Sequence, residues 1–130
     1  WLYPHSHEMM VVNAGHSPVL HYRDGRFRSI PPTGVALGLM ETRYTEVRVT
    51  MEPGDLFVTC SDGVTEPSAE HALGEEWVRA RIAAGADLPA EGLVQSILDG
   101  ALAAYGTPLD DMSVLVIKRE PESGPSGREA

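Results

Sequence analysis

The sequence has one cysteine, Cys60, and so no pair that could form a disulfide within the chain. Cys60 lies in an apolar run, which is typical of a reduced, buried thiol rather than a catalytic one. No apolar run approaches the roughly 18 residues that a membrane-spanning helix needs, and no secretory leader precedes the first strand-like segment. We therefore expect a cytoplasmic protein, or the cytoplasmic part of a larger one.

Basic residues are also scarce. The chain has 10 Lys and Arg against 19 Asp and Glu, which gives a formal net charge of -9. A surface of this sign repels a phosphate backbone, so nucleic-acid binding is disfavoured, whereas divalent cations suit an acidic chain. Many of these acids need serve only solubility. With 130 residues and an apolar share of 42%, the chain is long enough for one domain with its own core.

The first sixty residues predict β structure. Short apolar segments between Met9 and Ile30 are separated by turn signals, and Asp24-Gly25 is typical of a tight hairpin. Residues 31–40 are rich in Pro and Gly and predict a loop. Apolar and polar residues alternate from Thr45 to Met51, which indicates a half-buried strand, and Leu56–Cys60 is a continuous apolar run that predicts a strand buried on both faces.

The second half predicts two helices and one more strand. Gly74–Ala84 and Ala90–Tyr105 have helical composition, and Gly85 and Gly106 suit C-terminal caps. The second helix is expected to bury one face, formed by Leu93, Ile97, Leu98, Ala101, Leu102 and Tyr105. A strand over Met112–Lys118 follows. This order predicts an α+β layered fold in which the last strand joins a sheet already formed.

The two ends of the sequence indicate how far the folded part extends. The chain opens on Trp1 without an initiator Met, so we expect a fragment of a longer protein. Residues 1–119 are expected to be the folded part. Residues 120–130 combine Pro, Gly, Ser and charge, which predicts a disordered tail.

Carboxylates stand at two strand boundaries. Asp62 follows the apolar strand, with Gly63 after it, and Asp110 and Asp111 precede the last strand. If these strands are antiparallel neighbours, the two groups of acids meet at one edge of the sheet. Oxygen ligands without nearby Cys or His favour Mg²⁺ or Mn²⁺, and such ions serve phosphate chemistry. Each motif alone is equally typical of an ordinary turn or solvated loop.

Taken together, the motifs resemble those of a known family. The segments "VVNAGHSPVL", "GVALGL", "EPGDLFVTCSDGVTEP", "LGEEW" and "LDDMSVLVIKR" occur in the order found in metal-dependent PPM-type (protein phosphatase 2C fold) serine/threonine phosphatases of the SpoIIE/RsbU branch. The resemblance spans most of the chain. It implies the C-terminal part of an αββα sandwich, with phosphoserine or phosphothreonine on an anti-anti-sigma-factor-like protein as substrate.

The resemblance also implies site residues. Asp62 and Asp110 correspond to metal-binding aspartates of the family, with Gly63 beside the ion. Ser61 and Ser113 stand where the family usually has Thr, and both retain the hydroxyl. Two Mn²⁺ or Mg²⁺ ions are expected in the complete domain. The family's N-terminal half, whose Asp-Gly segment bridges both ions, has no counterpart in this sequence, so the isolated chain is expected to be inactive or nearly so; a sensor domain upstream is compatible with the family.

Four residues are candidates for a supporting shell: Asp111, Ser61, Glu66 and His16. Because successive residues of an extended chain point to opposite sides, Asp111 is not expected to bind as an equal partner of Asp110. Glu66 is left open between orienting a water molecule and contacting bulk solvent. The turn Asn13–His16 favours a structural role over a chemical one, with Gly15 required by the turn and His16 hydrogen-bonded.

Two other functions compete with phosphatase activity. The chain could be a non-catalytic docking module of a sigma-factor regulatory system, although such a module has no need of clustered carboxylates. His5 and His7 could instead lie on one strand and hold a transition metal in a cupin-like barrel. A loop with surface histidines explains the same residues, and two helices stand where a small barrel needs strands.

Overall fold

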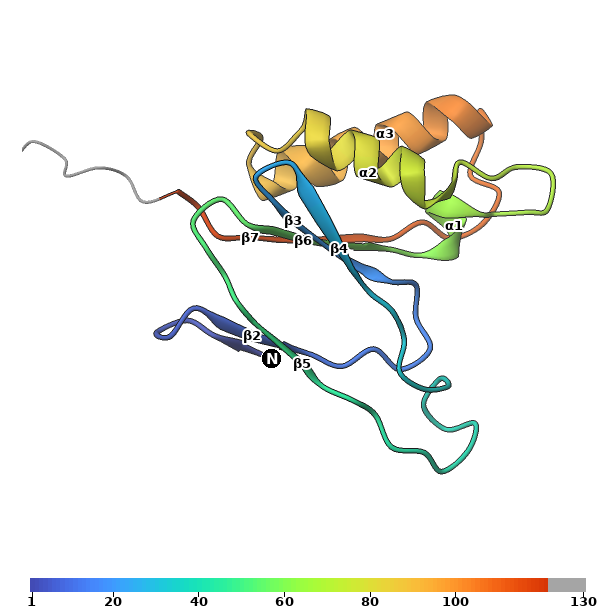
Figure 1. Cartoon of the computed structure of the whole chain (residues 1–130). Helices are drawn as coiled ribbons and strands as arrows, with labels where there is room; N and C mark the ends of the chain where they lie inside the picture. The colour runs from blue at the N-terminus through green and yellow to red at the C-terminus, as the bar shows by residue number, and fades with distance from the viewer. Residues whose placement is uncertain (122–130) are drawn as a thin grey trace, which may run out of the picture.

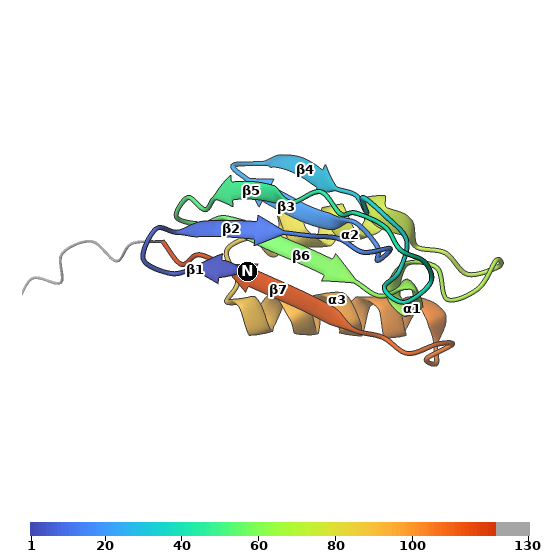
Figure 2. The same ribbon diagram turned by 90° about the horizontal axis from the view of Figure 1, so that it is seen from below.

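The computed structural model describes residues 1–121, which form three stacked layers (Figure 1). Two helices cover one face of a four-stranded antiparallel sheet, and a three-stranded sheet packs against its other face. Figure 2 shows the strands of the two sheets lying over one another. This arrangement confirms the α+β class and places helices on one outer side of the described part.

The four-stranded sheet has the order β4-β3-β6-β7, with every neighbouring pair antiparallel. Its strands are β3 (Val19–Arg23), β4 (Arg26–Ile30), β6 (Leu56–Cys60) and β7 (Val114–Lys118). Asp24 and Gly25 join β3 to β4, and both have positive φ, as a type I′ turn requires. Because Cys60 pairs with Val114, the end of β6 lies beside the start of β7.

The three-stranded sheet has the order β1-β2-β5 and is also antiparallel. Its strands are β1 (Leu2–Tyr3), β2 (Glu8–Val11) and β5 (Val47–Thr50). In and after β5, Val49 and Met51 are buried whereas Arg48 and Thr50 are exposed, which confirms the alternation predicted for this segment.

The long helices have the bounds that the sequence predicts: α2 spans Gly74–Ala84 and α3 spans Ala90–Tyr105. The backbone N–H of Gly85 donates to the carbonyl of Arg81, and that of Gly106 to Leu102, so both glycines are C-caps. Leu93, Ile97 and Ala101 of α3 are fully buried against the sheet, whereas Leu102 lies at the margin of the stripe and is exposed. No helix in residues 1–121 has the length and apolarity needed to cross a membrane.

Two cores hold the layers together. The core between the helices and the four-stranded sheet contains Leu20, Leu56, Val58, Cys60, Val64, Val78, Ile82, Leu93, Ile97 and Ala101. The core between the sheets contains Met9, Ile30, Val49, Met51 and Phe57. Each fully buried aliphatic side chain contributes about 1.5–3 kcal/mol to folding. β6 supplies both cores, which is why all of its residues except Thr59 are apolar.

A buried ion-pair network anchors the turn before β6. Asp55 is 1% exposed; its carboxylate lies 2.6 Å from an Arg23 nitrogen and 3.0 Å from His21 Nε2, and accepts the Glu52 N–H at 2.9 Å. The His21 ring stacks on Phe57 with 4.4 Å between centroids. Burial acts to raise the pKa of Asp55, but the hydrogen bonds from Arg23, Glu52 and His21 together hold this pKa below its ordinary value.

Some sequence-based expectations need correction or fall outside the structure. A one-turn helix, α1 (Asp62–Thr65), follows β6 and was not predicted, because four residues are too few to show a helical period. His5 and His7 lie in the turn between β1 and β2 rather than on a strand, so they do not alternate on one face as the cupin-like interpretation requires. The tail predicted over 120–130 lies outside the described residues from position 122 onward.

Candidate metal centre

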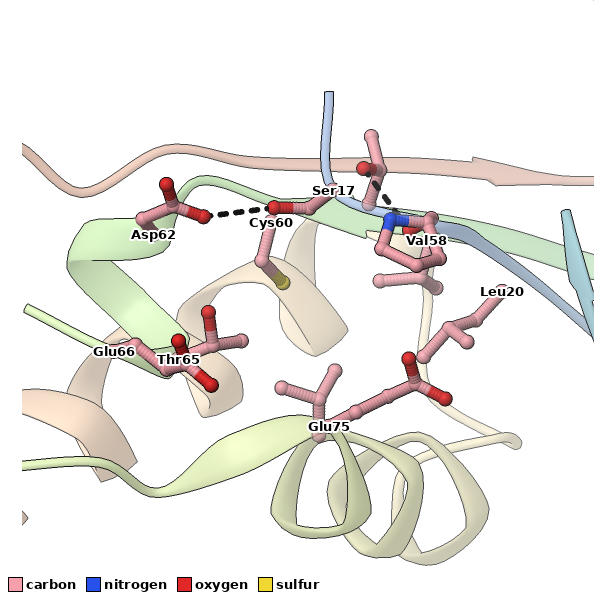
Figure 3. Close-up of a pocket in the computed structure, with 11 residues that line it drawn as sticks. Ser17, Leu20, Val58, Cys60, Asp62, Thr65, Glu66 and Glu75 are labelled. Carbon is pink, nitrogen blue, oxygen red and sulfur yellow. Dashed lines mark hydrogen bonds between the residues drawn. The ribbon is translucent and has the colours of Figure 1, made fainter. Parts of the chain in front are cut away.

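Asp62 stands at the point where β6 gives way to α1. The Ser61 N–H donates to the carbonyl of Ser113 at 3.0 Å, which extends the β6–β7 pairing by one residue before the chain turns into α1. The Asp62 carboxylate is exposed, and its Oδ1 accepts a hydrogen bond of 3.0 Å from the Ser17 hydroxyl (Figure 3). A rigid strand end thus presents Asp62 to solvent.

Asp110 and Asp111 reach the same place from the other strand. Both line an open pocket, together with Gly15, His16, Ser17, Ser61, Asp62 and Gly63. The predicted convergence of Asp62 and Asp110 is therefore confirmed. Asp111 lines the pocket as well, at a point where the chain before β7 is irregular, and its lesser role beside Asp110 stays a prediction. The Asp111 N–H donates to Asp110 Oδ1 at 2.8 Å.

Ser61 and Gly63 allow the segment after β6 and the segment before β7 to lie in close contact. The Ser61 hydroxyl donates to the Asp111 carbonyl at 3.1 Å and accepts the Ser113 N–H at 2.9 Å. A Cβ on Gly63 would overlap the Asp111 carbonyl oxygen and lie 3.2 Å from the carbonyl carbon of Asp110. Only glycine permits this approach. Ser61 and Gly63 therefore determine how close the Asp62 and Asp110 segments lie.

The loop before β3 forms the third side of the pocket. Asn13 is buried; its Oδ1 accepts the His16 N–H at 2.9 Å and its Nδ2 donates to the Ser17 carbonyl at 3.0 Å. Gly15 has φ of 75°, and a Cβ there would lie 2.5 Å from the backbone nitrogen of Ala36. These contacts agree with the structural role predicted for Asn13–His16. They also place His16 and Ser17 on the pocket.

Glu66 lines a second pocket rather than the one that holds Asp110. This second pocket lies between β3, β6, α1 and α2 and shares Ser17 and Asp62 with the first (Figure 3). Glu66 is exposed, and its N–H donates to the Asp62 carbonyl at 2.7 Å as the C-cap of α1. Cys60 also lines this pocket; burial raises the pKa of its thiol to about 12, which fits the inert role that the sequence predicts.

Ser17 is the residue that sequence reasoning missed. Ser-Pro before a strand is typical of an ordinary turn, so Ser17-Pro18 carried no chemical signal. Only the packing of β3 beside β6 brings Ser17 to Asp62. The nearest signal in the sequence was the position of Ser17 directly after the Asn13–His16 motif.

Comparison with known proteins identifies a family for this chain. The family model described as stage II sporulation protein E (SpoIIE) matches residues 2–120. The chain belongs to the SpoIIE family. The resemblance inferred from the spaced motifs is therefore confirmed.

Among curated relatives, the chain is 29% identical over 119 residues to phosphoserine phosphatase RsbU of Bacillus subtilis (strain 168). The match covers 88% of this chain and 36% of RsbU. The chain thus spans about a third of the length of that relative.

Two solved structures show the same fold. The Mn-presoaked phosphatase domain of SpoIIE from Bacillus subtilis superposes with a TM-score of 0.74 at 17% identity, over 96% of this chain and 56% of that one. The SiaA-PP2C domain of Pseudomonas aeruginosa gives a TM-score of 0.73 at 18% identity, over 91% of this chain and 49% of that one. The α-β-β layers described above therefore correspond to part of a PP2C-type domain.

The donor chemistry of the SpoIIE-family pocket fits a hard divalent cation. Asp62 and Asp110 offer carboxylate oxygens on one pocket, and Gly63 leaves room for close approach. Within residues 1–121, no cluster of three or more Asp, Glu, His or Cys side chains is arranged to hold a metal ion. The described residues thus supply part of a coordination shell.

Proposed function

We propose that this chain is part of a metal-dependent protein serine/threonine phosphatase, in which Asp62 and Asp110 bind the metal. The observation that carries the proposal is the meeting of these two aspartates, far apart in sequence, on one pocket at the edge of the sheet. Membership of the SpoIIE family supports it, as does the similarity to RsbU, a phosphoserine phosphatase.

The residues of this chain have distinct parts in the proposed centre. Asp62 and Asp110 would hold Mn²⁺ or Mg²⁺, two ions in the complete domain, with Gly63 beside the ion. Ser61 and the Asp111 carbonyl keep the two strand ends together. When bound, such ions neutralise a phosphomonoester dianion and activate water for attack on phosphorus. The similarity to a Mn-presoaked phosphatase domain supports the choice of a divalent ion.

We further propose a substrate and a cellular location. The substrate would be phosphoserine or phosphothreonine on an anti-anti-sigma-factor-like protein, and the location the cytoplasm. Residues 1–119 would form the C-terminal part of the phosphatase domain, and a regulatory sensor domain upstream would fit this role. RsbU, as a phosphoserine phosphatase, supports the substrate class.

Mn²⁺ titration of the chain, followed by the electron paramagnetic resonance signal of free Mn²⁺, tests the centre. Asp62→Asn and Asp110→Asn should each weaken Mn²⁺ binding at least tenfold, because each removes a charged ligand from a small donor set. Asp87→Asn is the matched control, since Asp87 is an exposed acid that lines neither pocket; it should bind as wild type does. Wild-type Mn²⁺ affinity in both site variants would rule out the proposed centre.

In a longer phosphatase that contains these residues, Asp62→Asn should abolish phosphoserine hydrolysis while the fold is retained. Phosphate release from a phosphoserine peptide gives the activity, and circular dichroism gives the fold. Retained turnover in the folded variant would remove Asp62 from the site. A protein that binds its partner equally well with and without metal, and shows no turnover, would instead be a docking module.

A further inference from the structure

We propose that Ser17 is a positioning residue of the metal centre, whose hydroxyl holds one oxygen of the Asp62 carboxylate and leaves the other for the cation. The inference rests on the proposed function, because it assumes that Asp62 binds metal. It assigns a role to a residue that lies 45 positions before Asp62 in the chain and belongs to a different strand connection.

The contact itself is specific. Ser17 Oγ donates to Asp62 Oδ1 at 3.0 Å, and Figure 3 shows the two side chains directed toward each other. Among residues 1–121, Asp62 Oδ2 accepts no side-chain hydrogen bond. Asp62 is exposed at the start of a one-turn helix, where packing restrains a side chain little. The Ser17 hydroxyl is the restraint, and it engages one oxygen only.

Ser17 is itself held from both sides. Its carbonyl accepts the Asn13 Nδ2 hydrogen bond at 3.0 Å, and the Asn13 side chain is buried and also accepts the His16 N–H. After Ser17, the proline ring limits the backbone of Pro18, whose carbonyl lies 3.4 Å from Thr59 Oγ1 on β6. The backbone that carries the Ser17 hydroxyl is thus held in place, which a positioning group requires.

A hydroxyl is well suited to this role chemically. It adds no charge to the pocket, so it does not compete with a cation for the carboxylate in the way that Lys or Arg would. Partners that orient metal ligands typically change metal affinity 10- to 100-fold when they are removed. Because the Ser17–Asp62 bond is exposed, we expect an effect at the lower end of this range.

The test compares two substitutions of nearly equal shape. Ser17→Thr keeps the hydroxyl, and Ser17→Val removes it, so their difference isolates the hydrogen bond. In the Mn²⁺ titration of the 130-residue chain, Ser17→Val should weaken affinity about tenfold and Ser17→Thr should stay within threefold of wild type. Thermal unfolding of each variant reports whether the fold is kept, and Ser17→Ala replaces Ser17→Val if the latter does not fold.

Two results would overturn the inference. Wild-type affinity in the variant without a hydroxyl would show that the bond does not matter, and an equal loss in Ser17→Thr and Ser17→Val would show that only side-chain shape matters. Asp62→Asn measured beside them separates the two proposals. If Asp62→Asn weakens Mn²⁺ binding and Ser17→Val does not, the role of Ser17 alone is refuted; if neither weakens binding, the metal centre is refuted with it.

Discussion

At the scale of single residues, the carboxylates divide into two kinds. Asp55 is almost completely buried, and its pKa is lowered by hydrogen bonds that outweigh its burial. Asp62 and Asp110 are exposed on an open pocket. A perturbed acid is often taken as a sign of function, but structural ion pairs perturb pKa values equally well. Asp55 is such a case, because its partners have a structural role. His21 and Arg23 lie on β3 and Glu52 lies in the turn before β6, so the contacts join that strand to that turn.

Asp55→Asn should lower the free energy of unfolding by roughly 3 kcal/mol, the cost of breaking a buried ion pair while leaving its partners in place. Arg23 also donates to the Thr50 carbonyl at 2.8 Å, so this network connects β3, β5 and the turn before β6. Urea denaturation at neutral pH measures the loss. A change below about 0.5 kcal/mol would show that the network does not stabilise the fold.

The pH dependence of stability follows from the same group. Since the folded pKa of Asp55 lies below its unfolded value, about 3.9, its contribution is present above that value and is lost as pH falls toward the folded pKa. The difference in unfolding free energy between wild type and Asp55→Asn should therefore be constant from pH 5 to 7 and shrink between pH 4 and 2. A constant difference down to pH 2 would contradict the lowered pKa.

At the scale of elements, the junction of β6, α1 and β7 builds the site. The geometry of this junction depends on a close contact between two backbone segments. The Asp111 carbonyl occupies the space that a Cβ on Gly63 would take. Ser61 stands at the N-cap of α1, yet its hydroxyl bonds across to Asp111 and Ser113 rather than capping the helix. The junction thus uses a helix-start residue to join two strands.

Gly63→Ala should cost about 1–3 kcal/mol of stability, the usual range for overpacking, and should also weaken Mn²⁺ binding because the Asp110 segment must move away. Gly92→Ala in α3 is the control: its Cβ would meet only ordinary contacts of 3.5 Å or more, and alanine favours a helix. Thermal unfolding and the Mn²⁺ titration provide the readouts. Equal behaviour of the two variants would exclude a special role for Gly63.

At the scale of the whole molecule, residues 1–121 form one helical layer and two sheets, and the match to solved phosphatase domains covers about half of their length. The pocket carries Asp62, which follows β6, and Asp110 and Asp111, which precede β7. Within residues 1–121, no group of three side chains is arranged to hold a metal ion. Metal binding and the positioning of Asp62 can be measured on this chain, whereas we expect turnover to need further ligands.

The 130-residue chain should hydrolyse para-nitrophenyl phosphate in Mn²⁺ no faster than a buffer control, because two carboxylates do not complete a two-metal centre. The measurement is nitrophenolate absorbance with and without Mn²⁺. Metal-dependent turnover that disappears in Asp62→Asn would show that these residues suffice for catalysis.

The sequence by itself determined the family and the secondary structure elements other than α1. Helical periodicity and the caps at Gly85 and Gly106 predicted α2 and α3 to the residue, since these signals are local. The convergence of Asp62 with Asp110 was predicted as a consequence of strand pairing, and the pairing of β6 with β7 confirms it.

Tertiary structure alone decided the details of the site. The Ser17 hydrogen bond, the place of Asp111 on the pocket and the close approach of the Asp111 carbonyl to Gly63 all depend on which strands neighbour one another and how irregular segments pack. The same holds for Asp55, which is the centre of a buried ion-pair network. Such contacts join residues tens of positions apart, and no periodic or local signal specifies them.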